Sequence, residues 1–98
     1  MRRRALKRRY GRANKSQLAI DAHHNALAIF QHARKQANQF DGMTSDGVDR
    51  RARYLRGQVK RIRRYLHAYP TAREFVRHLE DWAAQDERRA AALQNEGH

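Results

Sequence analysis

The sequence predicts an all-α fold: a three-helix bundle or a set of helical hairpins, preceded by a flexible basic arm. Apolar residues recur at steps of three and four in three successive stretches of the chain. Turn-forming residues separate these stretches, and no stretch alternates as a strand does. A chain of 98 residues has room for one small domain. We therefore expect an arm over residues 1–15 and a three-helix domain over residues 16–94.

The arm is defined by its charge. Gly11 interrupts any helix there, and no acid accompanies the basic residues. Like charges at this density repel one another, so we expect the arm to be disordered in the free protein. Bound to phosphates, the same charges are offset. The candidate nucleic-acid contacts of the arm are Arg2, Arg3, Arg4, Lys7, Arg8, Arg9, Arg12 and Lys15.

The first helix is predicted over residues 17–40, with Ser16 as its N-cap. Its apolar stripe is rich in alanine, which allows a neighbouring helix to approach closely. The segment DGMTSD that follows predicts a turn, in which Gly42 adopts the left-handed conformation that ends many helices. Either Ser45 or Asp46 is then expected to cap the second helix.

The second helix is predicted over residues 46–69, and it carries the clearest pattern in the chain. Its apolar residues alternate steps of four and three and form a heptad seam. Gly57 is a weak point within it, since glycine costs about 1 kcal/mol relative to alanine in a helix. Pro70 ends the helix, because the residue before a proline avoids the helical region. The seam consists of Val48, Ala52, Leu55, Val59, Ile62, Leu66 and Tyr69.

The third helix is predicted over residues 72–93. Thr71 and Glu74 have the spacing of a capping box, in which each side chain bonds the backbone N–H of the other residue. The apolar side of this helix includes Trp82, for which we expect a packing role.

The charge is unevenly distributed. The chain has a formal net charge of +12. Residues 1–15 carry +8 and residues 46–70 carry +6, whereas residues 16–45 are neutral and residues 71–98 carry −2. So large a basic excess repels itself in a compact state, and a polyanion is the simplest partner that offsets it.

On the second helix, the basic residues avoid the apolar seam. A rigid helix with basic groups along its outer face can follow a line of phosphates. No cluster of Asn or Gln accompanies them, so we expect contact with the phosphate backbone of DNA or RNA with low sequence specificity. The expected role is packaging, in a nucleoid or virion, or RNA assembly. The candidate contacts are Arg50, Arg53, Lys60, Arg61 and Arg64, whereas Arg56 and Arg63 flank the seam.

Two structural interpretations compete with this one. The arginines beside the seam can pair with acids on the third helix, or the basic face can simply be solvated. The third helix offers five acids for such pairs. They are Glu74, Glu80, Asp81, Asp86 and Glu87.

Catalytic and metal sites are not expected. The chain has no cysteine, no pair of histidines four residues apart and no glycine-rich phosphate loop. Ser16 and Ser45 are better explained as helix caps than as nucleophiles. We therefore expect no enzyme activity, no metal and no cofactor.

The alternative function is a helical adaptor, or an oligomerising subunit of a larger assembly. The heptad seam of the second helix could join two copies as a homodimer. A membrane surface is a weaker alternative, because the seam has no exposed large aromatic beside its arginines. The absence of cysteine fits an intracellular protein, in the cytoplasm or nucleoid, or a virion-internal one.

Overall fold

The computed structural model describes residues 15–96, which form three α-helices and one 3-10 turn. In chain order these are α2 (Lys15–Ala37), α3 (Ser45–Arg63), η1 (Pro70–Ala72) and α4 (Arg73–Glu96). Over these residues the three-helix, all-α prediction is confirmed, and no strand occurs among them. The predicted arm lies outside the described residues up to position 14, and Lys15 is the first residue of α2 instead of the end of the arm.

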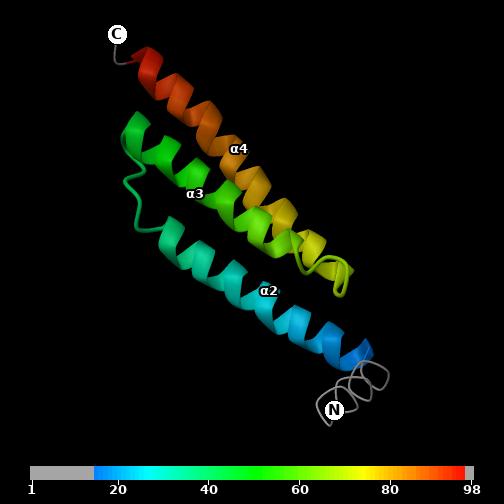
Figure 1. Cartoon of the computed structure of the whole chain (residues 1–98). Coiled ribbons are helices and arrows are strands. Elements are labelled where there is room, and N and C mark those ends of the chain that lie inside the picture. Colours follow the sequence, from blue (N-terminus) through cyan, green and yellow to red (C-terminus); the bar gives the residue numbers. More distant parts are fainter. Residues whose placement is uncertain (1–14, 97–98) are drawn as a thin grey trace, which may run out of the picture.

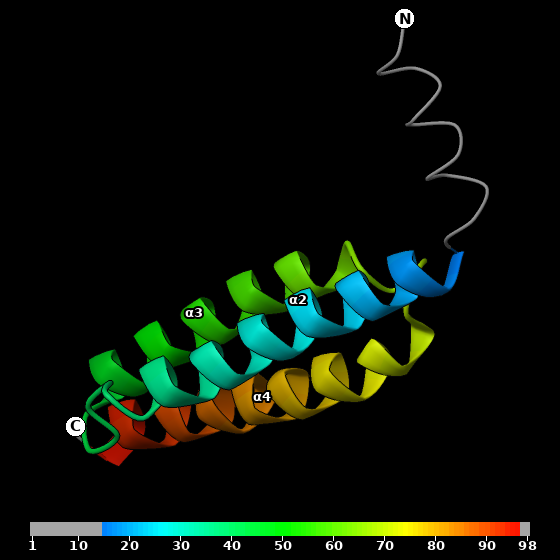
Figure 2. The ribbon, with the colours of Figure 1, turned by 90° about the horizontal axis from the view of Figure 1, so that it is seen from below.

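The helices run side by side. Figure 1 shows α3 and α4 as an antiparallel hairpin. α2 lies alongside them, antiparallel to α3 and parallel to α4. Figure 2 shows α2 lying against the pair, and α2 contacts both partners. The first residues of α2 lie at the end of the molecule where α3 turns into α4, as both views show (Figures 1 and 2). Contact between the rings of His23 and Tyr69, 4.8 Å apart, supports this placement.

The core is formed by the predicted seam. Leu55 and Ile62 on α3 are completely buried, as is Leu79 on α4. Opposite them α2 contributes small residues, among them Ala26 and Ala33, which are also completely buried. Burial of this apolar surface is the main force that holds α2 to the hairpin, because it removes the seam from water. The heptad seam is thus satisfied within one chain.

The second helix ends at Arg63 and not at Tyr69 as predicted. The amide of Tyr65 donates to the carbonyl of Ile62, and that of Leu66 donates to the carbonyl of Arg63. These bonds span three residues and tighten the chain out of the α-helix. Leu66 and Tyr69 still pack against the core. The apolar period therefore continues through a turn, which the sequence pattern did not distinguish from helix.

The helix beginnings also differ from the predictions. Ser16 lies inside α2. The N-cap of α3 is Thr44, whose hydroxyl accepts from the amide of Gly47 at 3.0 Å. Ser45 donates its hydroxyl to the carbonyl of Ala90 at 2.9 Å, which joins the start of α3 to the end of α4. Thr71 lies inside η1, so it does not cap α4 in the predicted box.

Two helix ends were misplaced by about one turn. α2 ends at Ala37 instead of residue 40, because the amide of Phe40 bonds back to Ala37 over three residues. Gly42 has no positive φ, so the predicted left-handed cap is absent. α4 continues to Glu96, beyond the predicted residue 93.

Candidate nucleic-acid interface

The basic candidates of α3 lie on its outer face. Residues separated by three, four and seven positions share one side of a helix, because a turn has about 3.6 residues. The seam occupies the opposite side, against α2 and α4. The side chains placed outward are all exposed, namely Arg50, Arg53, Lys60, Arg61 and Arg64.

Two of these arginines have acidic neighbours on their own helix. Arg50 pairs with Asp46 and Arg53 pairs with Asp49, each with an N–O distance of 3.1 Å. The side chains of Arg50 and Arg53 are 69% and 81% exposed, so water screens both pairs. Exposed pairs of this kind contribute at most about 1 kcal/mol. A phosphate can therefore displace either carboxylate at little cost.

The other three carry uncompensated charge. Among residues 15–96, no acid pairs with Lys60, Arg61 or Arg64. Arg61 donates a hydrogen bond to the amide oxygen of Gln58 at 3.0 Å, which orients it without neutralising it. It also lies near Tyr54, where burial raises the phenol pKa and the positive charge of Arg61 partly opposes that rise. The C-terminal half of α3 and its C-cap residue Arg64 thus present three free cations to solvent.

The arginines nearer the seam behave differently, because they join α3 to α4. Arg56 bonds both carboxylate oxygens of Glu87, at 3.0 and 2.6 Å, and this raises the pKa of Arg56 and lowers that of Glu87. Arg63 bonds Glu80 at 3.1 Å. Arg51 is paired with the buried Asp86. For these three arginines the first structural interpretation, pairing with acids of the third predicted helix, is confirmed.

The two ends of the α3–α4 hairpin carry net charges of opposite sign. Residues 57–79, which form the end with the turn, hold six Lys or Arg against one Glu, a net charge of +5. Residues 41–56 and 80–96, which form the other end, hold six Arg against eight acids, a net charge of −2. The inter-helix pairs lie mainly in this second half. We call residues 57–79 the basic end of the hairpin.

Two residues of the basic end were missed as candidates. Arg73 and Arg77 are exposed on the first turns of α4. The third predicted helix carries a net negative charge, so its arginines did not stand out. Their position at the start of that helix was the available signal, since an antiparallel hairpin places them beside the end of α3.

The arm is joined to this same end. Its residues 1–14, with seven Lys or Arg and no acid, lie outside the described residues. The backbone of Lys15, to which they are attached, lies at the end of the molecule that holds the α3–α4 turn (Figures 1 and 2). The residue to which the arm is attached therefore lies at the basic end of the hairpin.

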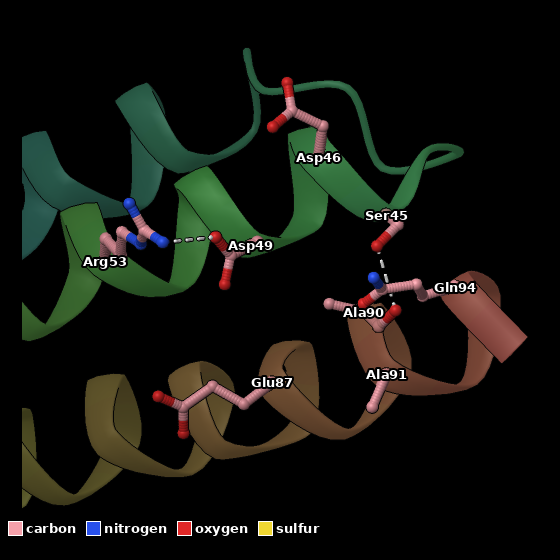
Figure 3. A pocket seen from close by; sticks show the side chains of 8 residues that line it. All are labelled: Ser45, Asp46, Asp49, Arg53, Glu87, Ala90, Ala91 and Gln94. Atoms are coloured by element: carbon pink, nitrogen blue, oxygen red, sulfur yellow. Dashed lines mark hydrogen bonds and ion pairs between the residues drawn. The ribbon is translucent and has the colours of Figure 1, made fainter.

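A shallow groove of about 680 Å³ lies at the opposite end of the hairpin. Figure 3 shows its residues, which come from the first turns of α3 and the last turns of α4, with Arg53 bonded to Asp49 and Ser45 bonded to Ala90. Its acids already pair with arginines of α3. Within the described part of the chain, no three acidic or histidine side chains are placed to hold a metal ion.

The described helices give no membrane span, since none is both long and apolar enough to cross a bilayer. The candidate nucleic-acid interface consists of the outer face of α3 and the adjoining basic end of the hairpin. No family model, curated protein or solved structure matches this chain.

Proposed function

We propose that this protein binds nucleic acid through the phosphate backbone, with little preference for base sequence. The ligand lies along the outer face of α3 and around the basic end of the hairpin, and the arm adds further phosphate contacts. The protein then serves to package or assemble nucleic acid inside a cell or a virion.

The observation that carries this proposal is the uncompensated charge of Lys60, Arg61 and Arg64. Several acids lie close in sequence and on the facing helix, yet they pair with the arginines beside the seam and at the start of α3. Three free cations within five residues repel one another. A polyanion relieves that repulsion and releases its own condensed counterions when it binds.

The contact chemistry favours phosphate over bases. Arginine donates in a planar fork that matches two phosphate oxygens, and its charge does not depend on pH in the physiological range. The only amide side chain on α3 is Gln58, whose oxygen is occupied by Arg61. With Gln58 as its only amide side chain, α3 has few of the groups that recognise adenine by paired hydrogen bonds, so we expect phosphate contacts to dominate.

Fluorescence anisotropy tests the proposal directly. Labelled duplex DNA, duplex RNA and single strands of equal length are titrated with the protein at low salt, with poly-glutamate as a competing polyanion that has no phosphate. We expect binding to at least one nucleic acid and weak competition by poly-glutamate. No binding to any of the three ligands contradicts the proposal. If poly-glutamate competes as well as unlabelled nucleic acid does, the protein binds polyanions in general and the proposed preference for phosphate is wrong.

A second candidate is the adaptor function, favoured by two exposed apolar side chains on α2. Leu18 is 56% exposed and Ile20 is 48% exposed, near the basic end. The seam of α3 is already covered by α2 and α4, so a homodimer through that seam requires the hairpin to open. Assembly in the absence of nucleic acid, measured by analytical ultracentrifugation, is the result that favours this candidate.

A further inference from the structure

Gly57 lies at the centre of the outer face of α3. Arg50 precedes it by seven residues and Arg64 follows it by seven, two helical turns away on the same side. Arg53 and Arg61 lie one turn away in either direction. Gly57 itself is exposed. The basic residues therefore surround a point on the helix that has no side chain.

Packing does not explain this glycine. A Cβ at Gly57 would have no other heavy atom within 4 Å, apart from its own helix backbone and chain neighbours. Gly47 provides the contrast, because a Cβ there would collide with the backbone carbonyl of Asp41. Gly57 also has ordinary negative φ, so no special conformation requires glycine. In an exposed helix interior, glycine makes the folded protein less stable than alanine does, because glycine loses more conformational freedom on folding.

One physical use of an exposed glycine is the close approach of another molecule to the backbone. We propose that Gly57 is the point at which a sugar–phosphate strand crosses α3, in contact with the helix backbone and straddled by the basic side chains on either side. The missing side chain lets the strand lie deeper between those side chains, which shortens their phosphate contacts and strengthens them. This inference rests on the proposed function and names the position where the ligand is seated.

Charge selects this occupant over a second copy of the chain. A small residue on a helix also permits close helix packing. Two copies meeting at Gly57 would bring their basic faces together, with Arg53 and Arg61 of each copy opposed by like charge. A line of phosphates has the opposite sign and the continuous form that fits between two sets of cations. An acidic helix of another protein shares the sign, and the experiment below separates it from nucleic acid.

The test adds side chains at Gly57 and measures folding and binding separately. Gly57→Ala adds one methyl group, and Gly57→Gln adds an uncharged side chain long enough to hold the strand away. Ala92→Gln is the matched control, because it places the same side chain at an exposed position of α4. Thermal unfolding is followed by circular dichroism, and affinity is measured by anisotropy with labelled duplex and single strands at one fixed salt concentration.

We expect Gly57→Ala to raise the unfolding midpoint, by about 4 °C if its full helix propensity is realised, and yet to weaken binding. Gly57→Gln is expected to weaken binding by roughly fivefold to tenfold, the loss of one or two phosphate contacts. Ala92→Gln leaves affinity unchanged. A more stable protein that binds less tightly cannot be explained by damage to the fold.

Two other outcomes overturn the inference. If the wild-type protein binds nucleic acid and Gly57→Gln binds equally well, Gly57 is not the seat of the strand, and the proposed function stands without it. If the wild-type protein binds no nucleic acid, both proposals fail together. In that case, loss of self-association or of binding to an acidic helical peptide in Gly57→Gln reassigns the position to a protein contact.

Discussion

Arg51 holds Asp86 with two hydrogen bonds: its Nε donates to Oδ2 and its Nη2 donates to Oδ1, both at 2.8 Å. Asp86 is buried, with 3% of its surface exposed. The guanidinium also lies over the ring of Trp82, 5.5 Å from the ring centre. This pair fixes how α4 is positioned along α3, because a buried carboxylate has to reach its one partner.

Replacing Asp86 with alanine is therefore expected to destabilise the protein strongly. The change leaves the guanidinium of Arg51 partly buried without its partner, and breaking such a pair typically costs about 3 kcal/mol or more. Urea denaturation followed by circular dichroism measures the loss.

The double variant Arg51→Met with Asp86→Leu separates charge from packing. It removes both charged groups and keeps apolar volume, so we expect it to unfold at a higher urea concentration than Asp86→Ala alone. A double variant as unstable as the single one contradicts the account of an uncompensated buried charge.

Gly47 is predicted to be required for packing. An alanine there would press against the backbone of Asp41, which has to move together with the turn before α3. Gly47→Ala is expected to lower the free energy of unfolding by roughly 1–3 kcal/mol, the usual range for overpacking. Chemical denaturation is expected to show that Gly47→Ala lowers the free energy of unfolding and that Gly57→Ala raises it. Changes of the same sign in both variants would show that the two glycines do not differ in their packing.

The stability is predicted to depend on pH through Glu87. Arg56 lowers the pKa of Glu87 in the folded protein below its ordinary value of 4.5. A lowered folded pKa means that the pair stabilises the fold above the pKa of the unfolded chain, and that this contribution disappears as pH falls through the folded pKa. The pair is 44% and 47% exposed, so the effect is below about 1 kcal/mol.

The comparison with Glu87→Gln checks this prediction. At neutral pH the variant is expected to be slightly less stable than the wild-type protein, and the two free energies of unfolding converge in acid well below pH 4.5. If the free energies of unfolding of the two proteins differ by the same amount at every pH in that range, the Arg56–Glu87 pair does not contribute to the pH dependence of stability.

The position of charge is predicted to matter more than its amount. Arg61→Gln with Arg64→Gln removes two free cations of the outer face. Arg88→Gln with Arg89→Gln removes the same charge from exposed positions near the other end of α4. We expect the first variant to bind all nucleic acids more weakly, regardless of sequence, and the second to bind nearly as the wild type does. If both variants lose the same affinity for nucleic acid, binding depends on net charge alone and the outer face of α3 has no special role.

The main fold features followed from periodicity. Val59 and Ile62 lie in the core as their heptad spacing predicted, because burial of one helical face sets that period. The end of α3 was misjudged because Leu66 and Tyr69 continue the same spacing while the backbone tightens into a turn. Apolar spacing reports which side chains are buried and does not by itself report how the backbone bonds.

Side-chain partners were less accessible to sequence reasoning. Thr44 caps α3, although Ser45 and Asp46 are equally good caps by composition, and Ser45 instead donates its hydroxyl to the carbonyl of Ala90. Asp86 was one of five possible partners for the arginines of α3. Its selection depends on the register between two antiparallel helices, which no local pattern specifies.

The salt dependence of binding tests the central claim most directly. The association constant of the wild-type chain for a labelled nucleic acid is measured by anisotropy over a salt series. A slope of log K against log salt of about −5 or steeper corresponds to roughly six or more phosphate contacts on duplex DNA. The account predicts such a slope, made shallower by roughly two in Arg61→Gln with Arg64→Gln. Binding that is absent at low salt, or that does not change with salt, contradicts it.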